Sequence, residues 1–317
     1  MSKELLEREL SKVGANANMR DKKLKYGIRE NMTPEEYAVE SEKLLQLAKK
    51  LRWDVQSPEA KQKQLDGLAK KRAMEGEYDT RHWSIQLASG HLQLPHVSIE
   101  VKGLVLALSS LLKPKSKGKI ADRSLKGFSL NDIADKFNRQ VKTLRPLLKE
   151  AELNGLIYSE KVGKENNYFI ESEYYQCGHS KEAEDFIKVF QAKMLGIAQD
   201  KKLNFTDLGI LSVLLNHMHY ESHIICEDPT NPIYKEMKVW RPQNIAEKLN
   251  LDIQAVRRSL RKFNNEGITV EMKAYGIKTI ILNPEMFSRR KLRIDMDKLK
   301  EVANREKGNL TRSNFFN

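Results

Sequence analysis

Four long polar side chains recur at helical spacing in the second half of the chain. They are Gln254, Arg257, Arg258 and Arg261, three or four residues apart, so a helix would carry them on one face. Arginine can donate two hydrogen bonds to the edge of a guanine, and glutamine can pair in the same way with adenine. This spacing therefore predicts recognition of nucleic-acid bases and phosphates.

A second group of polar and basic residues lies earlier in the chain. Its members are Arg139, Gln140, Lys142, Thr143, Arg145 and Lys149. Pro146 falls among them, and a proline inside a helix removes a backbone hydrogen bond and costs about 3 kcal/mol. That cost would be small if the helix began at Thr143, because the proline would then lie in the first turn. Phosphate binding and protein contact therefore stand beside base reading as alternatives for this group.

Both groups belong to a pattern that occurs twice, at residues 131–156 and 243–268, and lie in its second helix, except that Arg139 and Gln140 belong to the turn before it. Each copy opens with Ile-Ala, continues through a polar turn into a longer amphipathic segment, and ends on Gly155 or Gly267 before a β-like run. Glycine suits the left-handed residue that ends many helices. A short helix, a tight turn and a second helix form a helix-turn-helix.

The repeat extends beyond these helices in both directions. Apolar helices are expected after Ser98 and after Thr206, as N-caps, and a β-hairpin is expected after each glycine stop. Lys164 and Lys273, at the hairpin turns, are weaker candidates for phosphate contacts. The lysine-rich loop 113–126 is interpreted either as a solvated linker or as a further phosphate contact.

On these residues, segments 98–172 and 205–283 resemble the winged-helix superfamily, whose members mostly bind DNA. Two such units in one basic chain are also similar to replication initiators of plasmids and phages and to some transcriptional repressors. The resemblance implies a DNA-binding role for the second helix of each copy. It carries no residue that selects among these families.

Composition agrees with a polyanionic partner. The 317 residues carry a formal net charge of +13 and a pI near 9.4, with 40% hydrophobic and 31% charged residues. The sequence has no apolar run near the roughly 20 residues of a membrane span and no apolar leader at Met1. Its two cysteines do not form a disulfide framework. We expect a cytoplasmic protein that does not bind membranes.

The residue pattern gives little support for enzyme activity. His217, His219, His223 and Cys226 cluster, but their spacing matches no established zinc pattern. Walker, Gly-x-Ser-x-Gly and His-Glu-x-x-His motifs are absent. The Tyr174–Tyr175 pair is typical of a relaxase nucleophile, yet the metal-binding histidines of a relaxase are missing. We expect no enzyme activity, no cofactor and no metal.

The expected fold class is mainly α with small β-wings (α+β), built from two tandem winged-helix domains, a helical N-terminal extension and a linking helix. The N-terminal helices are expected at 2–13, at 33–52 and from Ser57. A strand pair around Trp83–Leu94 leads into the first domain, and a helix from Ser180 links the two. The predicted domains are residues 1–80, 81–175, 176–203, 204–288 and 289–317, the last a basic helix and tail.

The expected function is sequence-specific binding of double-stranded DNA in replication initiation or transcriptional control on a plasmid or phage. Two such units would place their second helices in successive major grooves, about 34–36 Å apart. The alternative is a scaffold that recruits replication or transcription proteins. RNA binding is a third interpretation, and a homodimer is a further expected assembly.

Overall fold

A computed structural model describes most of the chain from Asp79 onward and a few earlier residues. The described residues are 33–36, 39, 42–43, 46, 66–67, 79, 81–92, 94, 96–178, 186–274, 277–290, 293–307, 309–310 and 312–315. The chain divides into two compact units, Met1–Glu75 and Gly76–Asn317.

In the first unit, the predicted start of a helix at Thr33 is confirmed. The Thr33 amide donates to the Glu36 carboxylate at 3.0 Å, and the Glu36 amide donates to the Thr33 hydroxyl at 3.3 Å. This reciprocal pair is a capping box. The expected helix at 2–13 and most of those at 33–52 and from Ser57 lie outside the described residues; Asp66 and Gly67, within the last of these, are helical.

The second unit contains a duplication that is longer than the sequence indicated. The first repeat consists of β1 (Trp83–Leu87), α5 (Ala88–Leu92), α6 (Ile99–Ser109), α7 (Leu130–Lys136), α8 (Val141–Leu153), β2 (Ile157–Val162), β3 (Glu165–Ile170) and β4 (Tyr175–Cys177). The second repeat consists of β5 (Phe186–Phe190), α9 (Gln191–Gln199), α10 (Phe205–Asn216), η1 (Tyr234–Glu236), α11 (Pro242–Leu249), α12 (Ile253–Asn265), β6 (Thr269–Ala274), β7 (Ile277–Leu282) and β8 (Phe287–Ser288). A C-terminal segment follows with α13 (Met296–Lys307) and η2 (Arg312–Asn314).

The first and last strands of both repeats join in one antiparallel sheet with the order β4-β1-β5-β8. Equivalent backbone hydrogen bonds close each repeat: the Leu87 amide donates to the Tyr174 carbonyl at 3.0 Å, and the Phe190 amide donates to the Met286 carbonyl at 3.0 Å. The sheet therefore has a pseudo-twofold axis between β1 and β5.

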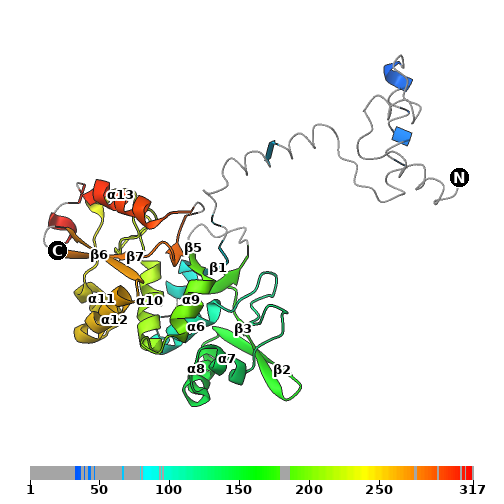
Figure 1. The fold of residues 1–317 in the computed structure, drawn as a ribbon, viewed down its shortest axis with the longest axis horizontal. Helices are drawn as coiled ribbons and strands as arrows, with labels where there is room; N and C mark the ends of the chain where they lie inside the picture. Colours follow the sequence, from blue (N-terminus) through cyan, green and yellow to red (C-terminus); the bar gives the residue numbers. More distant parts are fainter. Residues whose placement is uncertain are drawn as a thin grey trace. The chain divides into compact units, whose positions relative to one another are not determined.

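The core of the unit centres on the crossing of α6 and α10 (Figure 1). Both helices are apolar on nearly every face, as expected of helices buried all round. They meet at Gly103 and Gly209, where a Cβ on Gly103 would overlap the Phe205 carbonyl and one on Gly209 would overlap the Ile99 carbonyl. The helices approach this closely because neither glycine carries a side chain.

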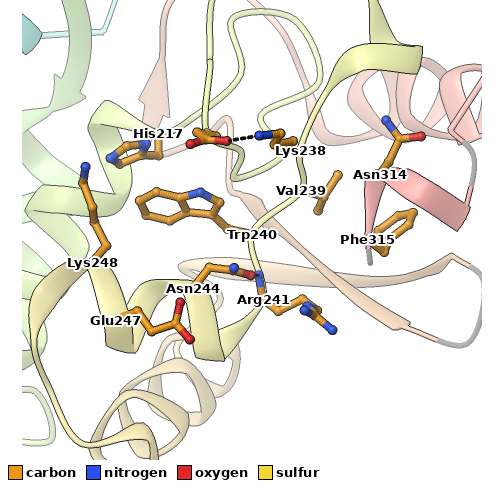
Figure 2. A pocket seen from close by; sticks show the side chains of 11 residues that line it. His217, Lys238, Val239, Trp240, Arg241, Asn244, Glu247, Lys248, Asn314 and Phe315 are labelled. Carbon is orange, nitrogen blue, oxygen red and sulfur yellow. Dashed lines mark hydrogen bonds and ion pairs between the residues drawn. The ribbon is translucent and has the colours of Figure 1, made fainter. Parts of the chain in front are cut away.

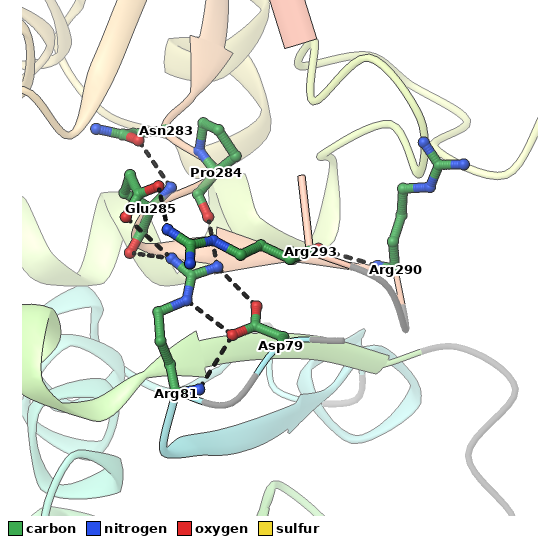
Figure 3. Close-up of polar contacts among 8 residues, drawn as sticks. Asp79, Arg81, Asn283, Pro284, Glu285, Arg290 and Arg293 are labelled. Atoms are coloured by element: carbon green, nitrogen blue, oxygen red, sulfur yellow. Dashed lines mark hydrogen bonds and ion pairs between the residues drawn. The ribbon is translucent and has the colours of Figure 1, made fainter. Parts of the chain in front are cut away.

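A polar cluster joins the beginning of the first repeat to the end of the second (Figure 3). The Arg81 guanidinium donates to both carboxylate oxygens of Asp79, at 2.8 and 2.6 Å, and to the Glu285 carbonyl at 3.0 Å. The same guanidinium lies 3.6 Å from the centroid of the Phe190 ring. Arg81 therefore links β5 to the turn that precedes β8.

The expected fold class, with two tandem winged-helix domains as separate bodies, is wrong. The fold is α+β, but its largest sheet has four strands drawn from both repeats, and α6 and α10 share one core. Both repeats belong to one compact unit. The reason is that α6 and α10 are buried against each other, so neither repeat has a complete core of its own.

Two expected elements are also wrong. The linking helix from Ser180 does not include Phe186–Phe190, which form the inner strand β5, and α9 begins only at Gln191. Trp83–Leu87 do form a strand, but Ala88–Leu92 turn into helix α5 in place of the expected hairpin, and β1 pairs with β4 and β5. In both cases the partners that decide the conformation are remote in sequence.

The repeated helix pairs and hairpins are confirmed. Both glycine stops have a positive φ, 67° at Gly155 and 65° at Gly267. The predicted N-cap Ser98 accepts a bond from the Val101 amide, whereas the cap of α10 is Asn204 and not Thr206. None of the helices described has the length and apolar content that crossing a membrane requires.

Substitution at the helix crossing should destabilise the unit. Gly103→Ala forces α6 and α10 apart, at a cost of about 1–3 kcal/mol in the free energy of unfolding, or more if the backbones cannot move. Urea denaturation measures the change. Gly196→Ala is the matched control, because Gly196 is helical in α9 with open space around it, and there alanine should be neutral or stabilising. Equal stability of the two variants would show that the crossing is not tightly packed.

Candidate nucleic-acid interface

Helix α12 is strongly amphipathic and begins at a well-formed cap. Asp252 accepts a hydrogen bond from the Ala255 amide at 2.9 Å. Val256, Ser259 and Phe263 are buried on its inner face. The outer face of the helix is therefore left for the polar side chains between them.

All members of the predicted stripe on α12 are exposed. Gln254, Arg257, Arg258 and Arg261 project from the outer face, and none of the ion pairs found among the described residues involves these guanidinium groups. An arginine side chain without a carboxylate partner keeps its donors available for a ligand. The stripe is a row of cationic donors on a rigid helix.

A buried carboxylate sets the rotation of α12 about its axis. Asp207, in the first turn of α10, accepts hydrogen bonds from the Ser259 hydroxyl at 2.6 Å and from the Lys262 ammonium at 2.7 Å. The Asp207 side chain is 5% exposed, so its carboxylate is shielded from water, while the Lys262 side chain is 39% exposed. With Ser259 and Lys262 held inward, the arginine stripe must face outward.

Helix α8 carries the equivalent stripe in a weaker form. The repeat places Lys142, Arg145, Pro146 and Lys149 at the positions of Gln254, Arg257, Arg258 and Arg261, and all of them are exposed. The helix begins at Val141, so Pro146 lies beyond the first turn, and a start at Thr143 is wrong. Proline thus takes the place of one of the three arginines, and two lysines provide point charges in place of planar donors.

The turn before α8 contributes one structural residue and two exposed ones. Arg139 donates to the backbone carbonyls of Asp200 at 2.7 Å and Leu203 at 2.6 Å, and it is half-buried. Its guanidinium therefore holds the loop before α10. Gln140, the N-cap of α8, and Thr143 are exposed next to Lys142.

The lysine-rich loop of the first repeat is held against the hairpin β2–β3. The Ile170 amide donates to the Gly118 carbonyl at 2.8 Å, and the Ile120 amide donates to the Tyr168 carbonyl at 3.0 Å. Lys115 and Lys117 take left-handed backbone conformations within it. Lys164 is exposed at the hairpin turn, whereas the side chain of Lys273 lies outside the described residues.

The histidine cluster of the second repeat is engaged by protein atoms. His217 Nδ1 lies 3.2 Å from the Cys226 carbonyl, His219 Nδ1 lies 3.0 Å from the Ser222 hydroxyl, and His223 Nδ1 lies 3.3 Å from the Leu282 carbonyl. Burial lowers the pKa of His217 and of His223 to about 4. Over the described part of the chain, no group of three His, Cys, Asp or Glu side chains is arranged to hold a metal.

A pocket of about 440 Å³ lies between α10, α11 and the C-terminal segment (Figure 2). The His217 and Trp240 rings stack at 3.8 Å, and Lys238 pairs with Glu227 at 3.3 Å. This volume is typical of ligand sites. The lining mixes cations and carboxylates, however, so it favours no one ligand charge.

The positioning role of Asp207 was missed in the sequence. A signal was present, because Asn204 and Asp207 have the spacing of a capping box, and both capping bonds are formed. The side-chain bonds to Ser259 and Lys262 span more than 50 residues and follow only from packing.

Comparison with protein-family models, with curated proteins and with solved structures gives no match to the chain. The exposed donors on α12 and α8 and their inward anchors are therefore the basis for assigning a function.

The buried histidines should make stability depend on pH. Their folded-state pKa lies below the ordinary 6.5, so the neutral form contributes stability above pH 6.5, and this is lost as the pH falls toward 4. For His223 the loss amounts to about 3 kcal/mol. In His223→Asn, where asparagine suits the positive φ of 56°, the fall in unfolding free energy between pH 6.5 and 4 should be smaller.

Urea denaturation at a series of pH values measures that slope. The exposed His96 provides the control, because His96→Asn should leave the slope of the parent protein unchanged. A slope that is the same in both variants and the parent would contradict the role of burial at His223.

Proposed function

We propose that the chain binds double-stranded DNA sequence-specifically, with α12 as the principal reading helix. The observation that carries the proposal is the exposed stripe Gln254, Arg257, Arg258 and Arg261, free of carboxylate partners in the described ion pairs and fixed outward by Asp207. The major groove of B-DNA is about 12 Å wide and admits one helix. Arginine and glutamine are the side chains that read guanine and adenine there.

In this proposal α8 is a second helix that contacts DNA, and its contacts are mainly to phosphates. Lys142 and Lys149 each offer a compact ammonium charge, and Arg145 offers a planar guanidinium with paired N–H donors. Both kinds of group suit phosphate oxygens. Gln140 and Thr143 lie beside them at the start of the helix. Within the proposal, α8 fixes the register of the protein on the duplex and α12 supplies most of the base recognition.

The proposed setting is the cytoplasm, and the proposed role is replication initiation or transcriptional control on a plasmid or phage. The net charge of +13 supports binding to a polyanion in general. Binding alone accounts for this role, so the proposal needs neither an enzymatic step nor a cofactor.

Removing the cationic stripe on α12 tests the proposal. Selection of bound duplexes from a random pool with the full chain should give one consensus. The triple variant R257A/R258A/R261A should bind it at least about 100-fold more weakly, since each base-reading arginine is worth ~1–3 kcal/mol. The slope of log affinity against log salt should also become shallower, by about one for each phosphate that the variant no longer neutralises.

The matched control removes three positive charges elsewhere. Lys193, Lys235 and Lys298 are exposed, and K193A/K235A/K298A should retain most of the affinity and the same consensus. If both triple variants lose affinity equally, bulk charge and not α12 is responsible. Absence of any consensus together with a shallow salt dependence would refute specific DNA binding.

Pro146→Arg tests the role of α8. The substitution gives α8 the cationic residue that α12 has at Arg258. The affinity for DNA should rise, because α8 gains a charge and a backbone donor. Pro146→Ala is the control, since it relieves the helix without adding charge. Fluorescence anisotropy with the selected duplex measures both variants. Equal affinity of P146R and P146A would show that α8 does not face the DNA.

A further inference from the structure

The two hairpins of the duplication differ on their outer faces. In the first repeat, cross-strand pairing places Tyr158 opposite Phe169, Glu160 opposite Asn167 and Val162 opposite Glu165. Side chains on one face of a strand alternate with those on the other, so these three pairs share one face. Ile157 and Ile170 lie on the other face and are buried in the core.

This outer face combines apolar side chains with three carboxylates, and Lys119 pairs with Phe169 along the edge of β3. The Tyr158 and Phe169 rings are stacked at 4.8 Å with an angle of 6° between them. Tyr158 is 36% exposed and Val162 is 58% exposed. Partial burial, and then the carboxylates of Glu160 and Glu171, raise the pKa of Tyr158. The carboxylates therefore lie close to the exposed ring.

The equivalent face of the second repeat is covered by the chain's own C-terminal segment. Ile281, at the position of Phe169, is 4% exposed and packs in a second apolar cluster with Ile294, Leu299, Leu310 and Phe315. Met272, at the position of Glu160, packs against the same cluster. Figure 1 shows α13 beside this hairpin.

The covering segment is also held by hydrogen bonds. The Asn314 amide group donates to the backbone carbonyls of Tyr234 at 3.0 Å, Lys235 at 3.1 Å and Met237 at 2.6 Å. The Val239 amide donates to the Asn314 carbonyl at 3.0 Å. In this fold, an amphipathic helical segment is thus a stable partner for the outer face of a hairpin.

We propose that the outer face of hairpin β2–β3, formed by Tyr158, Glu160, Val162, Glu165, Phe169 and Glu171, is a docking surface for a basic amphipathic helix of another protein. The C-terminal segment that covers the equivalent face in the second repeat indicates that the partner is an amphipathic helix. The carboxylates on the surface indicate that this helix is basic. Apolar side chains of the partner pack on Tyr158 and Val162, and its lysines or arginines pair with the glutamates.

A symmetric contact with a second copy through the same face is disfavoured. It would bring the Glu160, Glu165 and Glu171 carboxylates of one copy against the same acidic face of the other, and like charges facing each other across an interface cost several kcal/mol. The acidic face also separates this surface from DNA binding, because phosphates would be repelled. The docking surface uses no side chain of α12 or α8, so the docking proposal can fail without affecting the DNA-binding proposal.

The test is selection from a displayed library of amphipathic helical peptides, with the flanking positions varied between lysine and glutamate, on the full-length chain. The variant E160K/V162K alters the proposed surface. The matched control is I233K/E236K, which changes an exposed apolar residue and an exposed carboxylate of the second repeat. Anisotropy of the best peptide then gives its affinity for each protein.

We expect lysine-rich peptides to be enriched on the parent and on I233K/E236K. The best of them should bind E160K/V162K at least about ten-fold more weakly, a difference of ~1.4 kcal/mol. Each variant adds three positive charges, so neither should bind DNA more weakly than the parent. The proposal is overturned if no peptide is enriched, if enriched peptides are acidic, or if the two variants bind equally. A concentration-dependent dimer that only E160K/V162K disrupts would overturn it in favour of self-association.

Discussion

The contact on which the rest of the second unit depends is the close approach of α6 and α10 at Gly103 and Gly209. Two helices that meet backbone to backbone leave little freedom in their crossing. Around that crossing, each repeat places its own helix pair and hairpin, and the strands of both complete one sheet. The core is therefore shared, and the duplication is built into a single body.

The same crossing sets where α8 and α12 lie, because each packs against the central helix of its repeat. Equivalent positions on the outer helices make the link in both repeats: the Glu150 carboxylate accepts from the amide of the N-cap Ser98 at 3.3 Å, and the Lys262 ammonium donates to Asp207, in the first turn of α10, at 2.7 Å. The polarity of the contact is reversed between the repeats, but its place is preserved. Each outer helix is thus held by one of its own side chains, Glu150 or Lys262, to a group near the start of α6 or α10.

The sequence predicted local structure well where the deciding contacts are local. Capping at Ser98, the glycine stops at Gly155 and Gly267 and the amphipathic faces of α8 and α12 all depend on residues within one or two turns. The predictions failed where distant segments meet. Phe186–Phe190 were expected to be helical, yet they pair with β1, about 100 residues earlier, and burial between β1 and β8 overrides their local preference. The contacts of Asp207 with Ser259 and Lys262 were not predicted for the same reason, because they join residues that are distant in sequence.

Carrying both halves on one polypeptide has an evolutionary consequence. In a symmetric homodimer, every substitution appears on both halves at once, so the two must change together. Here Pro146 stands in one half while Arg258 keeps the equivalent place in the other, and Glu160 faces solvent where Met272 lies under the C-terminal segment. Two copies of one arrangement on a single polypeptide thus leave each half free to acquire its own specialisation, while the glycine crossing keeps the twofold arrangement of the scaffold.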